Sequence, residues 1–172
     1  LKINIPTTIV GTPNIGLEWT VSQQFAVNVD GLWMPYMFKK TEEVFRGLQL
    51  TADFRYYINP KYYYTNDLFD GFYLGPYAMY FDFNMGRKKH EEMSENRRYT
   101  GWGISGGVSV GYKMYLSKRF RLDFNLGLGF AHLQYDTYIL GAENTRPIAK
   151  KDTRAWIGPT KIGVHLVYNL FR

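Results

Sequence analysis

The chain has 172 residues, which is the size of a single domain, and its 18% aromatic content is too high for a disordered chain. It contains no cysteine, which excludes disulfides, thiol nucleophiles and iron–sulfur clusters, and its net charge of +6 suits phosphate-rich partners only where basic residues share one surface. No apolar run reaches the roughly 18 residues that a membrane-spanning helix needs, so only β-strands are left as a means of crossing a bilayer.

Apolar and polar residues alternate with a period of two through most of the chain, which is the pattern of β-strands with two unlike faces. In chain order the predicted strands cover residues 1–5, 14–21, 25–33, 48–58, 72–85, 102–116, 120–130 and 156–170. The clearest runs from Phe120 to Phe130, where Phe and Leu alternate with Arg, Asp, Asn and Gly. In 72–85, Pro76 leaves the assignment of the two faces open. No helix pattern, repeat or linker is visible, so we expect one domain over 1–172.

The connections between these strands alternate in length. Those at 22–23 and 117–118 are short, whereas those at 35–46, 86–98 and 141–154 are long and polar. We therefore expect an all-β fold, an eight-stranded antiparallel up-and-down transmembrane β-barrel with turns at one end and loops at the other. The long connection 60–70, with its run Tyr62, Tyr63 and Tyr64, does not fit this alternation.

The composition of the two faces indicates what each one meets. The polar face is rich in Gly, Ser and Asn, as expected for the crowded lumen of an eight-stranded barrel. The apolar face of the seven strands with clear alternation has no Asp, Glu, Lys or Arg, as expected for contact with lipid. Aromatic residues near strand ends fit the two girdles at headgroup level: Trp33, Tyr56, Trp102, Phe120, Trp156 and Tyr168. A soluble lipocalin-like carrier, with the apolar face packed as a core, is the alternative.

The charged residues of the polar face form a nearly balanced set that we expect to pair inside the lumen, because buried charges persist when they are paired. This lumen charge network comprises Lys2, Glu18, Asp30, Asp53, Arg55, Lys113, Arg121, Asp123 and Lys161. A gated pore or proton path is one interpretation. A closed, packed lumen is favoured, since eight strands leave no open channel.

Three local segments resemble a known family. They are Lys2 and Asn4 followed by 12–18 (TPNIGLE), then 25–35 (FAVNVDGLWMP), and then 53–57 (DFRYY). They are similar to a Bacteroidota family of small outer-membrane β-barrels described only as a domain of unknown function. The chain departs from that pattern at Asp53, where Glu is expected, in the longer 60–70 connection, and at Arg172 after the final aromatic residue. The resemblance implies an OmpA/OmpX-like barrel without enzyme activity and an accessory role beside fimbrial or other envelope-assembly components.

No residue is expected to be catalytic, to bind a cofactor or to ligate a metal. A lipid A-modifying outer-membrane enzyme is the alternative, and a serine hydrolase would need a Ser–His pair at the lipid surface. His132 lies near the outer rim of an apolar face, but Leu133 and Gln134 follow it rather than a serine. His165 belongs to the polar face and His90 to a loop.

Partners are expected from the ends of the barrel. Basic residues of the 86–98 loop could bind lipopolysaccharide phosphates: Arg87, Lys88, Lys89, Arg97 and Arg98. The last strand resembles the insertion signal read by the barrel-assembly machinery, through Lys161, Gly163, Leu166, Tyr168 and Phe171. We expect an integral outer-membrane protein with periplasmic termini, in contact with membrane lipid and a larger envelope complex. Nucleic acid is not an expected partner, because no sheet combines basic residues with stacking aromatics.

Overall fold

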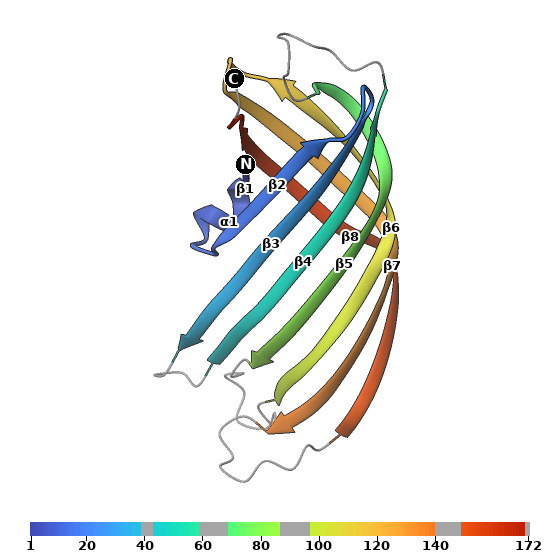
Figure 1. Ribbon diagram of the computed structural model, residues 1–172. Helices are drawn as coiled ribbons and strands as arrows, with labels where there is room; N and C mark the ends of the chain where they lie inside the picture. Colours follow the sequence, from blue (N-terminus) through green and yellow to red (C-terminus); the bar gives the residue numbers. More distant parts are fainter. Residues whose placement is uncertain (39–42, 59–68, 87–96, 140–148, 171–172) are drawn as a thin grey trace.

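The computed structural model describes residues 1–38, 43–58, 69–86, 97–139 and 149–170. Its strands form one closed barrel in which each pairs antiparallel with the next and the last pairs with the first (Figure 1). The elements are β1 (Lys2–Asn4), α1 (Ile5–Ile9), β2 (Asn14–Thr20), β3 (Phe25–Phe38), β4 (Glu43–Tyr57), β5 (Gly71–Gly86), β6 (Arg97–Tyr115), β7 (Phe120–Ile139) and β8 (Ala149–Tyr168). The predicted all-β, eight-stranded, up-and-down barrel is confirmed.

One end of the barrel carries two tight turns and both termini (Figure 1). The β2–β3 turn is closed by Val21 N donating to Phe25 O at 2.8 Å, and the β6–β7 turn by Leu116 N donating to Phe120 O at 3.1 Å. We call this the turn end, and the end where β3 finishes and β4 begins the far end.

The predicted first strand is confirmed as β1, but the helix α1 begins at Ile5 and corrects the expectation of a chain without a helix pattern. Pro6 occupies the first turn, where its fixed φ favours a helix and its missing N–H costs nothing. The hydroxyls of Thr7 and Thr8 both donate to Asn4 O, at 3.1 and 2.7 Å. These local hydrogen bonds end β1 after Asn4.

Two predicted loops are shorter than expected. β3 continues to Phe38 and pairs there with Glu43, so most of the predicted 35–46 loop is strand. β8 likewise begins at Ala149, inside the predicted 141–154 loop. Residues 151–154 are Lys, Asp, Thr and Arg, and all four are exposed. Both faces of β8 are therefore polar there, and the sequence shows no alternation with a period of two. Residues 59–68, with Tyr62 to Tyr64, and residues 87–96 and 140–148 lie outside the described residues.

The structure settles the faces of β5. Tyr73, Tyr77 and Met79 are buried, whereas Leu74 and Tyr80 are exposed on the outside. Phe81 consequently faces the interior, where its ring lies against Gly103, and Asp82 faces outward. Pro76 is tolerated because the β4–β5 ladder is interrupted between the pairs Asp53–Tyr77 and Tyr56–Leu74.

A bulge in β8 places Trp156 on the luminal face of the sheet rather than on the outer face predicted for a girdle, although its side chain is 56% exposed. The register with β7 shifts between Gly127 and Leu128, so that Lys161 lies opposite Gly127 but Pro159 lies opposite Leu128. Beyond the bulge, Ile157 lies opposite the outward-facing Phe130, and Trp156 lies opposite the buried Ala131. The one-residue shift exchanges the two faces.

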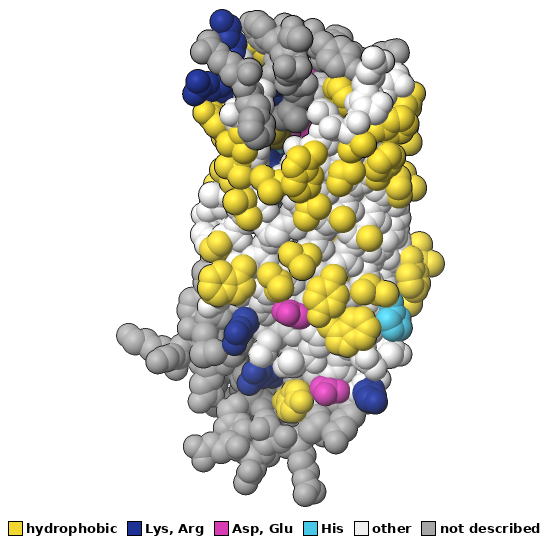
Figure 2. Space-filling view, viewed as in Figure 1, with side chains coloured by type: hydrophobic (Ala, Val, Ile, Leu, Met, Phe, Trp, Pro, Cys, Tyr) yellow, Lys and Arg dark blue, Asp and Glu magenta, His cyan; other side chains and the backbone are white. Residues whose placement is uncertain are grey.

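The polar face of the sheet points into the barrel and the apolar face points outward. Arg55 and Asp123 are 0% exposed, whereas Leu126 and Phe130 are 41% and 48% exposed. Hydrophobic side chains cover the mid-height of the surface in Figure 2, and charged side chains appear towards its two ends. This distribution is the reverse of that in a soluble barrel with an apolar core.

Candidate functional site: the luminal charge network

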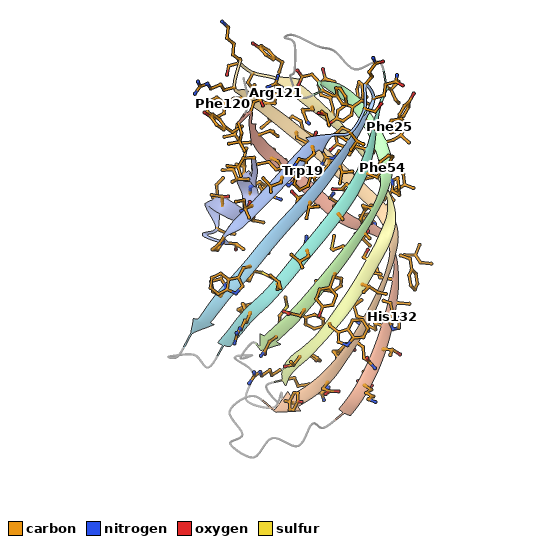
Figure 3. The ribbon with its side chains drawn as sticks, in the orientation of Figure 1. Trp19, Phe25, Phe54, Phe120, Arg121 and His132 are labelled. Carbon is orange, nitrogen blue, oxygen red and sulfur yellow. The ribbon has the colours of Figure 1, made fainter. Side chains whose placement is uncertain are left out.

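Seven strands, β1 to β4 and β6 to β8, contribute to the lumen charge network. Alternation within each strand directs every second side chain inward, and the barrel brings side chains from opposite walls together. Glu18 comes from β2, Arg55 from β4 and Asp123 from β7, although the first and last are far apart in the sequence. The network lies towards the turn end, where Figure 3 labels Arg121.

Arg55 occupies the centre of the network. Its Nη1 donates to Glu18 Oε2 and to Asp123 Oδ2, both at 2.9 Å, and all three side chains have exposures of 0 to 1%. Glu18 also forms an ion pair with Lys113. Hydrogen bonds between charged groups are the strong ones, and the dry surroundings strengthen them further.

A second group of pairs surrounds this centre. Lys2 Nζ lies 3.3 Å from Asp30 Oδ1 and 3.5 Å from Asp123 Oδ2. Lys161 forms an ion pair with Asp53. Asn28 Nδ2 donates to Asp30 at 2.6 Å and to Asp53 at 2.8 Å, so an amide links the two carboxylates. All nine predicted residues therefore lie in the lumen, and each has an ionic partner.

One carboxylate was missed by the sequence analysis. Arg121 Nε lies 3.2 Å from Asp70 Oδ1, and Asp70 is 2% exposed. With Asp70, the described ion pairs join five cationic side chains (Lys2, Arg55, Lys113, Arg121, Lys161) to five acidic ones (Glu18, Asp30, Asp53, Asp70, Asp123). The network is thus neutral when every group is ionised.

Tyrosines complete the network. Tyr57 OH donates to Glu18 Oε1 at 3.0 Å, and Tyr73 OH donates to Asp123 Oδ1 at 2.7 Å. The Arg55 guanidinium also lies 4.3 Å from the centre of the Tyr73 ring, within the range of a cation–π contact. Tyr57 packs against Tyr73 and Phe69 with ring centroids 5.2 and 5.1 Å apart. Aromatic rings therefore fill the space beside the ion pairs.

Glycines on the luminal face make room for these large side chains. A Cβ atom at Gly111 would lie 2.3 Å from the Tyr73 ring, and one at Gly16 would lie 2.1 Å from Asp30 Oδ1. Both distances are far below van der Waals contact. The described interior near the turn end is therefore packed with paired charges and rings, as expected for a closed lumen.

The described side chains contain no cluster of three or more His, Asp or Glu residues able to hold a metal ion. His165 is buried, and its Nδ1 lies 3.0 Å from Asn125 Nδ2. His132 lies on the outer surface (Figure 3), and its direct cross-strand neighbours are Ile104 and Ala155, which carry no hydroxyl.

The predicted surface contacts fall partly outside the described residues. Arg87, Lys88, Lys89 and Phe171 belong to undescribed segments. Arg97 begins β6 and is exposed, and Arg98 Nε donates to Asn84 Oδ1 at 2.7 Å. Of the predicted insertion signal, Lys161 and Gly163 face the lumen, whereas Leu166 and Tyr168 are half-buried on the other face.

Comparisons with known proteins yield one match. A family model described as "Protein of unknown function (DUF3575)" matches residues 1–170. No curated protein and no solved structure matches the chain. Among the described residues, no helix is long and apolar enough to cross a membrane.

Proposed function

We propose that this chain, which belongs to the DUF3575 family of proteins of unknown function, is an integral outer-membrane β-barrel that serves as a non-catalytic structural or accessory subunit of a cell-envelope assembly. The observation that carries the proposal is the inverted distribution of side chains. Charged groups are sealed inside in pairs, and Leu, Ile, Val and Phe cover the outside. Water on the outer surface would leave that apolar area unburied, whereas lipid would cover it.

The height of the apolar surface supports contact with a bilayer. Along β7 the outward residues Phe120 to Phe130 are Phe or Leu throughout. Ten residues at about 3.3 Å each, tilted by about 40°, span roughly 25 Å, which is the height of the apolar band of outer-membrane barrels.

A cross-strand row of polar residues limits this surface near the far end. Arg46, Asn84, Thr100 and Asp136 lie opposite one another on β4 to β7. On β6, Thr100 is the next position on the outward face after Ile104 and Trp102, in the direction of the far end. A charged side chain on the outer face costs much free energy at the bilayer midplane and little at the interface. The row therefore fits the level of the headgroups.

Aromatic pairs ring the outside near the turn end. Phe120 packs on Tyr168 with ring centroids 5.3 Å apart, and Phe25 packs on Phe54 at 5.4 Å (Figure 3). Phe72 and Tyr112 form another such pair at 4.6 Å. Tyr168 and Tyr112 supply the amphipathic rings that favour the headgroup region, so this level fits the periplasmic girdle of a barrel whose termini are periplasmic.

The alternatives fit less well. A lipocalin-like carrier needs an apolar cavity, but the described lumen near the turn end is filled by ion pairs. A lipid A-modifying enzyme needs a nucleophile and base in reach of each other, and neither direct cross-strand neighbour of His132 carries a hydroxyl. Arg97 and Arg98 begin β6 at the far end, where their positive charge suits contact with lipopolysaccharide phosphates. The same end is where the subunit contacts its envelope partner.

Folding into detergent or lipid vesicles tests the proposal. Urea-denatured protein diluted into detergent micelles should regain strand signal in circular dichroism and run as a faster gel band that shifts on boiling. Dilution into buffer alone should give aggregates. A monodisperse, folded monomer in buffer without detergent would refute the membrane assignment, and a change in lipid A mass on incubation with the folded protein would favour the enzyme.

A further inference from the structure

The wall of the barrel has an opening between β8 and β3. Only the three residues of β1 pair with β8 there, and β2 pairs with β3 no further than Leu32. Among the described residues, β8 from Ala149 to Val164 pairs only with β7, and β3 from Met34 to Phe38 only with β4. The two strands diverge towards the far end in Figure 1, and we call the gap between them the side opening.

The two bordering strands carry proline where a backbone nitrogen points into the side opening. Trp33 N donates to the β2 side of β3, so alternation directs the nitrogen of Pro35 to the same side. Phe120 O accepts from the β6 side of β7, so Leu128 also bonds to β6, and Pro159 opposite it turns its nitrogen away from β7. Proline has no N–H, so these positions need no partner strand. The sequence of both borders therefore suits an opening.

At its turn-end limit the side opening is a cavity of about 40 Å³ lined from both faces of the sheet. Leu32 and Lys161 line it from the luminal face. Ile15 and Ile162 line it from the outer face. Ile162 is 81% exposed, whereas Leu126, which lies opposite it on the fully paired β7, is 41% exposed. The lumen and the outer surface therefore meet at this border.

Tyr77 closes the lumen charge network towards the far end. It is 5% exposed, and its hydroxyl group is hydrogen-bonded to Thr160 Oγ1, so its side chain crosses the lumen from β5 to β8. The ring lies 5.6 Å from Lys161 Nζ, and a Cβ atom at Gly129 would lie 2.7 Å from the hydroxyl oxygen. The packed part of the lumen thus ends at Tyr77, and we call the part beyond it the far lumen.

The far lumen is lined by apolar and small side chains. One inward row crosses β3 to β7 as Leu32, Gln49, Phe81, Gly103 and Leu133. The next row towards the far end begins at Met34 and reaches Tyr135 on β7. Neither row carries a charged side chain on these five strands. The charged and the apolar parts of the lumen are therefore separate.

The far lumen is accessible, in contrast to the packed interior near the turn end. Phe81 lies against the wall, since a Cβ atom at Gly103 would lie 2.5 Å from its ring. Phe81 and Leu133 are only half-buried, and the inward-facing Trp156 beside the side opening is 56% exposed, whereas Tyr57 is 0% exposed. An eight-stranded barrel is wide enough either to be filled by its own side chains or to hold one small ligand. The far lumen fits the second case.

The side opening faces hydrocarbon if the proposed function holds, and the inference rests on that function for this depth. Ile162 and Ile157 on the β8 border lie opposite Leu126 and Phe130. Both pairs belong to the stretch of β7 whose outward Phe and Leu residues span the apolar band. Acyl chains are then the medium beside an accessible, apolar lumen.

Basic residues lie on the same border at the level of the headgroups. Lys151 N donates to Asp136 Oδ1 at 2.7 Å, and Asp136 belongs to the cross-strand polar row at that level. The side chains of Lys151 and Arg154 are exposed there. Cationic side chains at this level attract phosphate, so the charge of the border suits an anionic lipid.

We propose that the far lumen holds one acyl chain of an anionic membrane lipid, which enters from the bilayer through the side opening. The chain packs against the inward rows of Leu32 and Met34, and Tyr77 limits how deeply it enters. The phosphate of the same lipid contacts Lys151 and Arg154.

Photo-cross-linking of the folded protein tests this site. The protein is refolded into vesicles that contain phosphatidylglycerol with a diazirine midway along one acyl chain, and adducts are located by mass spectrometry after irradiation. Adducts should form on the inward Phe81 and Leu133 as well as on the outward Leu126 and Phe130. Adducts on outward residues alone would overturn the proposal. The same diazirine on phosphatidylcholine should give several times fewer inward adducts, and equal yields would overturn the anionic lipid.

A matched pair of variants supplies the control. Leu133→Asp places a carboxylate in the far lumen opposite Arg154, a cation able to pair with it, and should reduce adducts at Phe81 several-fold. Gln134→Asp adds the same charge at the next, outward position and should leave them unchanged. Equal yields at Phe81 in the two variants would overturn the site.

Gel mobility before and after boiling separates this proposal from the proposed function. Heat-modifiable protein in vesicles without inward adducts would refute the acyl-chain site and leave the membrane assignment intact. Protein that is folded and soluble without lipid would instead refute the proposed function.

Discussion

Replacing Arg55 by methionine removes the central cation of the lumen charge network. Methionine approximates the length of the arginine stem but leaves Glu18 and Asp123 without the guanidinium that bonds both at 2.9 Å. Breaking a fully buried ion pair by deleting one partner costs about 3–5 kcal/mol, because an uncompensated charge stays buried. The described network would change from five cations and five acids to four and five.

Urea unfolding of the protein folded in detergent measures this cost. With a slope of about 2 kcal/mol per molar urea, Arg55→Met should lower the midpoint by about 1.5–2.5 M. Arg119→Met is the matched control, since Arg119 is exposed in the β6–β7 turn, where its guanidinium donates to Tyr168 OH at 3.0 Å. That variant should lose less than about 1 kcal/mol.

A double variant separates charge from packing. Glu18→Gln added to Arg55→Met removes one of the two carboxylates that lost the guanidinium, and leaves four cations and four acids. The double variant should therefore cost less than the sum of the two single changes, as expected for residues in one network. Equal midpoints for Arg55→Met and Arg119→Met would refute the argument that the paired charges stabilise the barrel.

Two further pairs of variants test the faces of the sheet and the packing of the lumen. Leu126→Arg should cost about 2–4 kcal/mol on folding into vesicles, because Leu126 faces outward near the middle of β7. Asn125→Asp should cost less, since the new carboxylate lies in the polar lumen and accepts a hydrogen bond from His165 Nδ1 in the tautomer that carries its proton there. Comparable losses would contradict the assigned faces. Gly111→Ala should lower stability by about 1–3 kcal/mol through contact with the Tyr73 ring. Gly31→Ala should change stability little, because the atom nearest to the added Cβ is 3.6 Å away. Equal urea midpoints for Gly111→Ala and Gly31→Ala would contradict a tightly packed lumen.

The fold was predictable because strict alternation survives wherever one face of a strand meets lumen and the other does not. The charged residues of the lumen charge network follow from that alternation alone. Asp70 does not, since it lies just before β5, at the end of a connection whose sequence has no alternating pattern. Tyr73 was hidden for a related reason, because Pro76 interrupts the β5 pattern that would have placed it inside.

The helix α1 was missed because its stability is not local. Thr7, Thr8 and Ile9 are β-branched residues with low helix propensity, so the segment gives no helix signal. Besides the local hydrogen bonds to Asn4 O, the helix is held by the side chain of Asn14, which follows it in the chain and begins β2. Long-range side-chain bonds of this kind leave no periodic signal in a sequence.

Lys2 has a second role in holding the short strand β1. β1 is only three residues long, and a strand so short gains little from backbone pairing alone. The Lys2 side chain reaches across the lumen to Asp30 on β3 and Asp123 on β7, at 3.3 and 3.5 Å, so it anchors β1 to two other walls of the barrel. The ion pairs near the turn end thus compensate for the few backbone bonds of β1.

Hydrogen exchange on the folded protein tests this anchoring role. In Lys2→Met, the amides of Leu166 and Tyr168, which face β1, should exchange faster, while those in the middle of β6 should keep their protection. Lys118→Met, in the exposed β6–β7 turn, should change neither set. Uniform acceleration in every strand would mean that Lys2 contributes only to global stability. Unchanged exchange at Leu166 and Tyr168 would mean that β1 is held to β8 without the lysine, and either result would contradict the anchoring role.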